Sequence, residues 1–168
     1  SILIDRHLKA SPDNNVAPLF DFFEPWCQDQ NRHGDIFTML IRCWPGLRQG
    51  LRGRLLSRFF LWSVFLTHSL TVCERGDFYR ILGMDPASFD AEVMRQTNRT
   101  ARRAFPWVFD LEGSRYLELR DRVVACHREL QAGKAEGAGL LRQLGRRLRF
   151  GRLLLEQFLQ PMVPASAG

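Results

Sequence analysis

The sequence contains few of the residues and patterns that mark several common functional classes. Of its 24 lysines and arginines only two are lysines, Lys9 and Lys134. The four cysteines show no C-x-x-C spacing, which argues against a zinc site or a small disulfide framework and suits a reducing cytoplasm. Gly-rich phosphate loops and nucleophile motifs are also missing. No long run alternates apolar and polar residues, which argues against a β-rich fold.

The charge balance favours an anionic partner. The 168-residue chain has a formal net charge of +6, 45% hydrophobic residues and 25% charged residues, an ordinary globular composition. Such a charge favours acidic lipid, an acidic protein or nucleic acid as a partner. No nucleic-acid-binding motif accompanies it, so we expect no nucleic-acid partner. A GC-rich genome explains the arginine bias equally well. Ser1 to Arg6 do not resemble a signal peptide, and we expect a soluble or membrane-peripheral protein.

Proline, glycine and capping residues divide the chain into helices, so we predict an all-α fold in one domain, residues 1–168. Residues 1–132 should hold most of the helices, 133–139 a flexible linker, 140–160 a basic amphipathic helix and 161–168 a frayed tail. The helices are expected at Ser1 to Leu8 (the end of a helix), 17–43, 51–74, 77–82, 86–104, 114–132 and 140–159. Within 86–104 the spacing predicts an inner face of Phe89, Val93, Gln96, Thr100 and Ala104.

The first long helix carries a polar pair on its apolar side. Inward positions step by three and four, so Gln30 should point at the core and His33 should share that side, with Glu24 near the same face. Di-iron carboxylate bundles place a Glu and a His at this i, i+3 spacing. Here the carboxylate is an amide, so His33 is either a metal ligand or, as we favour, a core histidine that donates to a carbonyl or to Asp29.

Two further segments are candidates for binding a partner or a membrane. Residues 59–70 are apolar almost all round but too short to span a bilayer, which predicts a buried core helix or one that dips into a bilayer face. In the last helix a leucine stripe (Leu141, Leu144, Leu148, Leu155, with Phe158) runs beside many arginines, and it could cover its own core, lie in a membrane interface or dock on an acidic protein. The candidate contact residues are Phe59, Phe60, Trp62, Phe65, Arg142, Arg146, Arg147, Arg149 and Arg152.

Several motifs together resemble one enzyme family. Residues 23–35 (FEPWCQDQNRHGD), Arg58-Phe59-Phe60, Phe78-Tyr79, Leu82-Gly83-Met84-Asp85, Thr97-Asn98-Arg99-Thr100 and Phe105-Pro106 are similar to the C-terminal half of the aerobic magnesium-protoporphyrin IX monomethyl ester oxidative cyclases. That family makes the fifth ring of chlorophylls and bacteriochlorophylls. The resemblance implies a partial ferritin-like bundle with extra C-terminal helices.

The resemblance also implies what this chain lacks. The family carries Glu-x-x-His where this chain has Gln30-Asn31-Arg32-His33, and some members carry Glu at the position of Gln96. The family's other iron-binding helices lie upstream of the position matching Ser1, so Glu24, Gln30 and His33 are vestigial candidates for a metal site and we expect no cofactor in this chain alone.

Two hypotheses follow from this reading. The favoured one is a non-catalytic structural subunit of a photosynthetic pigment–protein assembly, peripheral on the cytoplasmic side of the membrane and bound to other membrane proteins. The alternative is the C-terminal part of a working cyclase, which needs an N-terminal half to complete an iron site.

Overall fold

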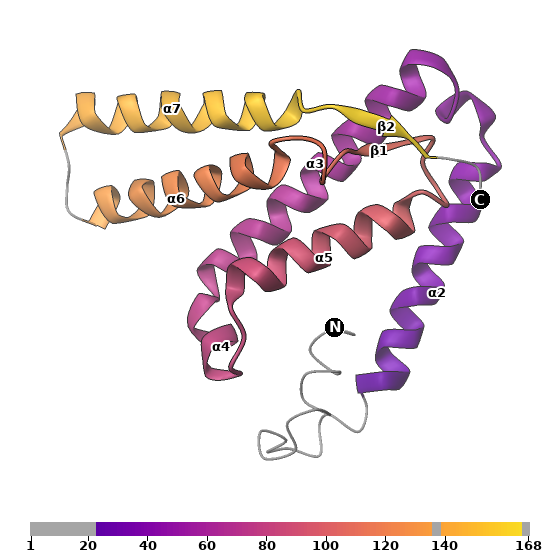
Figure 1. Cartoon of the computed structure of the whole chain (residues 1–168), viewed down its shortest axis with the longest axis horizontal. Coiled ribbons are helices and arrows are strands. Elements are labelled where there is room, and N and C mark those ends of the chain that lie inside the picture. Colours follow the sequence, from indigo (N-terminus) through magenta and orange to yellow (C-terminus); the bar gives the residue numbers. More distant parts are fainter. Residues whose placement is uncertain (1–22, 136–138, 166–168) are drawn as a thin grey trace.

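Six α-helices and a two-stranded sheet make up the described part of the chain, in a computed structural model that describes residues 23–135 and 139–165 (Figure 1). The elements in order are α2 (Phe23–Arg42), the 3-10 helix η3 (Pro45–Leu47), α3 (Gly50–Glu74), α4 (Gly76–Ile81), α5 (Pro86–Ala101), β1 (Trp107–Phe109), α6 (Tyr116–Ala135), α7 (Leu140–Phe158) and β2 (Met162–Pro164). The predicted all-α class is confirmed. The helix expected at Ser1 to Leu8 lies outside the described residues.

Local sequence signals fix the start of α5. The Asp85 carboxylate accepts a hydrogen bond from the Ser88 backbone N–H at 2.8 Å, and Pro86 occupies the first helical position, where no N–H is needed. Gly83 just before this cap adopts a positive φ of 74°, a conformation that a side chain would strain. The predicted boundary between α4 and α5 is therefore confirmed.

α3 is the central helix of the fold. It contacts α5, α6, α7 and β1, and its buried residues recur about every fourth position: Gly53, Ser57, Leu61, Phe65, Ser69 and Val72. The whole helix has 25 residues and an 18-residue window of mean hydropathy 1.3, so by length and composition it is able to cross a bilayer. The predicted apolar run at 59–70 is one part of this longer helix, so the argument that it is too short to span a bilayer applies to the run and not to the whole of α3. Its buried stripe packs against protein, as the predicted core helix would.

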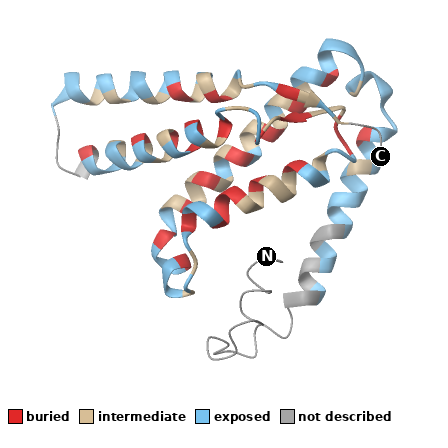
Figure 2. Cartoon of the chain, viewed as in Figure 1, coloured by how far each residue is buried: buried red, intermediate tan, exposed pale blue. Residues whose placement is uncertain are grey.

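The main core lies where α3, α5, β1 and the start of α6 meet, and Figure 2 shows the buried positions concentrated there. Its buried members are Leu61, Phe65, Met94, Val108, Phe109, Leu111, Tyr116 and Met162. A second cluster joins α6 to α7 through Leu119, Val123, Cys126 and Leu153. The end of α2 joins the body through a third cluster of Ile41, Ala104 and Phe105.

α6 and α7 form an antiparallel hairpin that projects from the body (Figure 1). The two short strands close the base of this hairpin, with Val108 opposite Val163 and Phe109 opposite Met162. Backbone hydrogen bonds from Ala165 N to Pro106 O and from Asp110 N to Pro161 O extend the pairing.

Two predictions about the C-terminal part of the chain are corrected. Residues 162–164 of the tail expected to fray are instead strand β2, because Met162 fills the main core and its neighbours satisfy their backbone groups on β1. Residues 166–168 of that tail lie outside the described residues. In addition, α6 continues to Ala135, so it occupies the first residues of the linker expected at 133–139.

The predicted leucine stripe of α7 does not cover the protein's own core, which was one of the three alternatives for it. The buried residues of α7 are Leu153 and Gln157, whereas Leu141, Leu144, Leu148 and Leu155 are exposed. The helix has two apolar stripes, and α6 covers the one that contains Leu153.

Candidate functional site

An open groove of about 380 Å³ separates α2, α3 and α5. Three stacked or tilted rings form one wall: Phe37 lies 5.2 Å from Phe60, and Phe60 lies 4.9 Å from Phe105, between ring centroids. The remaining lining residues are small, apolar or uncharged: Gly34, Thr38, Leu61, Val93, Gln96, Thr97, Thr100, Ala101 and Ala104. The groove is therefore a largely apolar surface with a few hydroxyl and amide groups.

His33 of α2 lies on the surface and not in a core. Its side chain is 63% exposed, and Nε2 is 3.9 Å from the nearer Asp29 carboxylate oxygen. The expected neighbour Asp29 is thus in place, but the expected burial of His33 is wrong. The described body of the molecule packs against α2 near Phe37 and Ile41, and His33 lies one turn or more before these contacts. The Glu24 and Gln30 side chains lie outside the part that the structure describes.

Gln96 of α5 faces the groove, as its resemblance to a family Glu position suggested. Its Nε2 donates to a Glu92 carboxylate oxygen at 3.0 Å, and the side chain is half-buried. Glu92, one helical turn before Gln96, therefore places a carboxylate next to this wall of the groove.

The di-iron centre implied by the resemblance does not fit the described residues of this chain. They contain no group of three or more His, Cys, Asp or Glu side chains that could hold a metal ion. The resemblance implies a carboxylate at position 30 and, in some members, at position 96, but this chain carries the amides Gln30 and Gln96 there. An amide oxygen is neutral and a weak ligand for iron.

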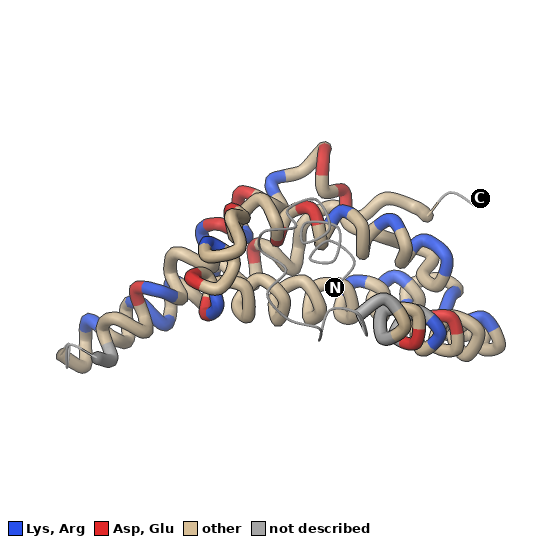
Figure 3. Tube along the Cα trace, turned by 90° about the horizontal axis from the view of Figure 1, so that it is seen from below, with Lys and Arg blue, Asp and Glu red and all other residues tan. Residues whose placement is uncertain are grey.

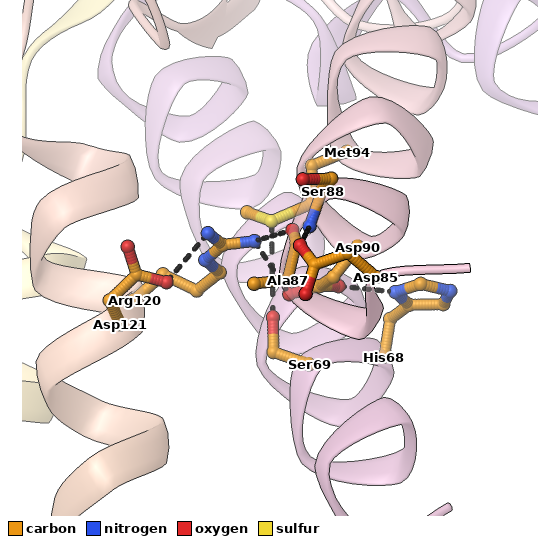
Figure 4. Close-up of polar contacts among 9 residues, drawn as sticks. All are labelled: His68, Ser69, Asp85, Ala87, Ser88, Asp90, Met94, Arg120 and Asp121. Carbon is orange, nitrogen blue, oxygen red and sulfur yellow. Dashed lines mark hydrogen bonds and ion pairs between the residues drawn. The ribbon is translucent and has the colours of Figure 1, made fainter. Parts of the chain in front are cut away.

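The opposite side of α5 carries a buried charged cluster (Figure 4). An Asp90 carboxylate oxygen lies 2.6 Å from His68 Nδ1 of α3, and the other accepts from Arg120 Nη1 of α6 at 3.1 Å. The same Nη1 donates to Ala87 O at 2.9 Å, and Nη2 donates to Asp121 at 2.6 Å. The Asp90 and Arg120 side chains are only 4% and 6% exposed. This His68–Asp90–Arg120 cluster therefore cross-links three helices.

This cluster was not predicted from the sequence. Of the expected inner face of α5, Phe89 and Ala104 are buried as predicted, and Val93, Gln96 and Thr100 line the groove. Asp90, Met94 and Asn98 are buried as well, although they were not expected on the inner face. The 3.6-residue period permits both faces, and the positions of α3 and α6 select between them. No local signal connects residues 22 and 30 positions apart.

The aromatic residues expected to bind a partner have different environments. Phe59 is 60% exposed and is available for contact. Phe60 lies in the groove wall, and Trp62 packs edge-on against Phe158 at 5.4 Å. Phe65 is 1% exposed in the main core, so the expected contact of Phe65 with a partner is corrected. Its place in the buried stripe of α3 accounts for its burial.

The fold and the groove define an all-α protein. One wall of its helix bundle is open, and the described residues do not supply a complete set of metal ligands. Comparison with known proteins then gives the family. The chain is 55% identical over 166 residues to a magnesium-protoporphyrin IX monomethyl ester [oxidative] cyclase of Prochlorococcus marinus (strain MIT 9211), covering 99% of this chain and 46% of the relative. It is 44% identical over 169 residues to cyclase 2 of Thermosynechococcus vestitus, covering 98% of this chain and 48% of that relative.

The chain is thus a homologue of the C-terminal half of these cyclases, and the resemblance predicted from its motifs is confirmed. It spans about half the length of the curated relatives it matches. No protein-family model matches the chain, and no solved structure matches it either.

Proposed function

We propose that this chain is the C-terminal part of a magnesium-protoporphyrin IX monomethyl ester oxidative cyclase, acting in chlorophyll biosynthesis. The observation that carries the proposal is the 54–55% identity to Prochlorococcus cyclases over 99% of this chain. The matched stretch of 166 residues includes α2, the α5 wall and the α6–α7 hairpin alike. This identity favours the enzyme over our initial preference for a structural subunit.

In this proposal the groove between α2, α3 and α5 receives helices from the cyclase half that the relatives carry upstream. Exposed apolar side chains continue from the groove along α2 and η3, among them Ile36, Met39, Leu40, Trp44 and Leu47. A contiguous apolar surface of this kind is typical of a protein interface. The partner half supplies the missing walls of the bundle, either in the same polypeptide or as a separate chain.

In this proposal an iron centre forms only when the other half of the enzyme is present. When bound, the iron centre would supply the oxygen chemistry of the reaction, while the described residues of this chain provide an apolar wall and an exposed His33 beside it. The carboxylates needed to neutralise the metals must come from elsewhere, because Gln30 and Gln96 carry none.

Gln30 favours a second candidate function. If the amide abolishes the site, the chain is a non-catalytic, cyclase-like subunit that contributes contacts to a photosynthetic pigment–protein assembly. The two candidates differ in one measurable property, which is the activity of a complete bundle that contains Gln30.

A chimaera distinguishes the two functions. This chain replaces the C-terminal half of the Prochlorococcus cyclase, and conversion of magnesium-protoporphyrin IX monomethyl ester is measured for the chimaera and for its Gln30→Glu and His33→Ala variants. Activity in the unmodified chimaera, lost in His33→Ala, supports the cyclase. Activity that requires Gln30→Glu supports the non-catalytic subunit. A chimaera that folds but is inactive with either residue, beside an active parent enzyme, overturns the cyclase proposal.

A further inference from the structure

α7 has a leucine face that nothing in the described structure covers. Six leucines in the helix and at its C-cap are between 52% and 88% exposed: Leu140, Leu141, Leu144, Leu148, Leu155 and Leu159. At ~100° per residue, Leu148 and Leu155 lie about 140–160° around the helix from Leu153. Leu153 is buried against α6, so the leucine face points away from the body of the protein. Burying α7 on α6 therefore leaves a second apolar stripe without a partner.

Two arginines border this leucine face, because at ~100° per residue Arg147 and Arg152 lie on either side of it. α7 contains five arginines and one glutamate, and basic positions outnumber acidic ones at the projecting end of the hairpin (Figure 3). Arg146 donates to Glu129 O of α6 at 2.9 Å and Arg149 to the Glu129 carboxylate at 3.2 Å, so these two hold the hairpin together. Arg142 and Arg147 are exposed and form no side-chain hydrogen bond or ion pair with the described residues.

A hollow of about 370 Å³ adjoins the leucine face. Three arginines from both helices of the hairpin and two leucines line it: Arg122, Leu148, Arg149, Arg152 and Leu153. Guanidinium groups bind phosphate and sulfonate oxygens through paired hydrogen bonds. Arg149 and Arg152 also pair with the Glu129 and Glu156 carboxylates, whereas Arg122 makes no hydrogen bond or ion pair with the described residues. The hollow thus joins an arginine-rich site open to an anionic headgroup with an apolar surface suited to acyl chains.

We propose that the leucine face and its arginine-lined hollow bind the surface of an anionic lipid bilayer. The helix lies in the plane of the interface with its leucines among the acyl chains. The long apolar stems of the flanking arginines reach outward, so that their charges remain at the headgroups. A second copy of this chain is a poor occupant, because stacking two such faces brings their arginine borders together and like charges repel. This surface is on the hairpin, separate from the groove, and the proposal does not depend on the cyclase activity.

Vesicle flotation of the full chain tests the proposal. Native chain should float with vesicles of phosphatidylcholine and phosphatidylglycerol, and bind far less to phosphatidylcholine alone. Replacing Leu144, Leu148 and Leu155 by Gln should weaken binding about tenfold or more, since the apolar contribution is lost. Its matched control replaces the exposed Leu51, Leu55 and Ile81 of α3 and α4 by Gln and should bind like native chain.

A second variant tests the charge. Replacing Arg122, Arg147 and Arg152 by Gln should weaken binding by about fivefold for each arginine at low salt, an effect that shrinks as salt is added. The control variant replaces Arg52, Arg99 and Arg102, which are exposed on α3 and at the end of α5, and should retain native binding. Far-ultraviolet circular dichroism verifies that each variant keeps its helices.

Two results would overturn the proposal. If native chain stays unbound with anionic vesicles, the leucine face is not a membrane face, and an acidic protein becomes its expected partner. If the control variants lose binding as much as the α7 variants do, membrane contact lies elsewhere on the protein.

Discussion

At the scale of single residues, the His68–Asp90–Arg120 cluster is the feature whose energetics are easiest to test. A buried ion pair contributes little net stability against apolar replacements, but removing one partner leaves the other charge buried without compensation. Arg120 offers an internal comparison, because one of its carboxylate partners is buried and the other is on the surface.

We predict that Asp90→Asn lowers the free energy of unfolding by about 3 kcal/mol or more, since the Arg120 guanidinium then faces a neutral amide in the interior. Asp121→Asn is the matched control. Its carboxylate contacts the same guanidinium but is 60% exposed, so the expected cost is about 1 kcal/mol or less. Urea unfolding of both variants measures the difference, and equal costs would contradict a buried role for Asp90.

His33 gives the opposite expectation. Because its side chain is largely exposed, His33→Ala in this chain alone should change the free energy of unfolding by about 0.5 kcal/mol or less. Thermal unfolding provides the measurement. A destabilisation of several kcal/mol would mean that His33 is covered, as the sequence pattern first predicted.

At the scale of elements, helix boundaries follow from local signals while helix faces do not. Asp85-Pro86 begins α5, and Pro45 begins the turn after α2, each through its own backbone chemistry. By contrast, α5 and α7 each have two apolar or mixed stripes, and only the neighbouring helices determine which stripe is buried. Only part of the groove was predicted from the sequence. Gln96 was expected on the inner face of its helix, whereas the stacking of Phe37 on Phe60 depends on how α2 packs against α3.

The Asp85 cap should make the stability of α5 depend on pH. Hydrogen bonds from Ser88 hold the pKa of the Asp85 carboxyl below its ordinary value of 3.8. A carboxyl whose folded-state pKa is depressed stabilises the fold at pH values above the unfolded pKa, and this contribution disappears as pH falls through the folded pKa. Asp85→Ala should therefore lower the unfolding midpoint at pH 7, with a difference from native chain that shrinks below about pH 4. A difference that stays constant down to pH 2 would contradict this assignment.

Arg58 of α3 secures the C-terminal end of α7. Its Nη1 donates to the backbone carbonyls of Phe158 and, at 2.9 Å, Gln160, and its guanidinium lies over the Phe109 and Phe158 rings. Arg58→Ala should cost about 1.5–3 kcal/mol in the free energy of unfolding, since charged hydrogen bonds to helix-end carbonyls are lost. The exposed Arg52, two turns earlier, is the control and should be nearly neutral when changed to Ala. Urea denaturation compares the two, and similar costs would refute the tethering role.

At the scale of the whole molecule, the apolar surface along α2 is expected to govern association more than folding. Met39 and Leu40 are 66% and 62% exposed, whereas the adjacent Ile41 is buried against Phe105. The Met39→Lys, Leu40→Lys variant should therefore reduce self-association of the isolated chain in sedimentation experiments and leave its unfolding midpoint nearly unchanged.

Ile41→Ala is the companion variant for this surface. It should cost about 2–4 kcal/mol in the free energy of unfolding by creating a cavity in the cluster that joins α2 to the body. The interface interpretation fails if the lysine variant unfolds as easily as Ile41→Ala does.

The pairing of β1 with β2 has a consequence for synthesis on the ribosome. Phe109 cannot pair until Met162, its partner in the sheet, has been synthesised, and Met162 lies 53 positions later in the chain. At ~5–20 residues per second, translation needs roughly 3–10 s to cross that interval. During this time the nascent chain presents an unpaired β1 edge and an unfilled position in the main core where Met162 will later insert. The residues of β2 are thus the ones that close this part of the fold, which makes the nascent chain a natural client for chaperones until synthesis reaches them.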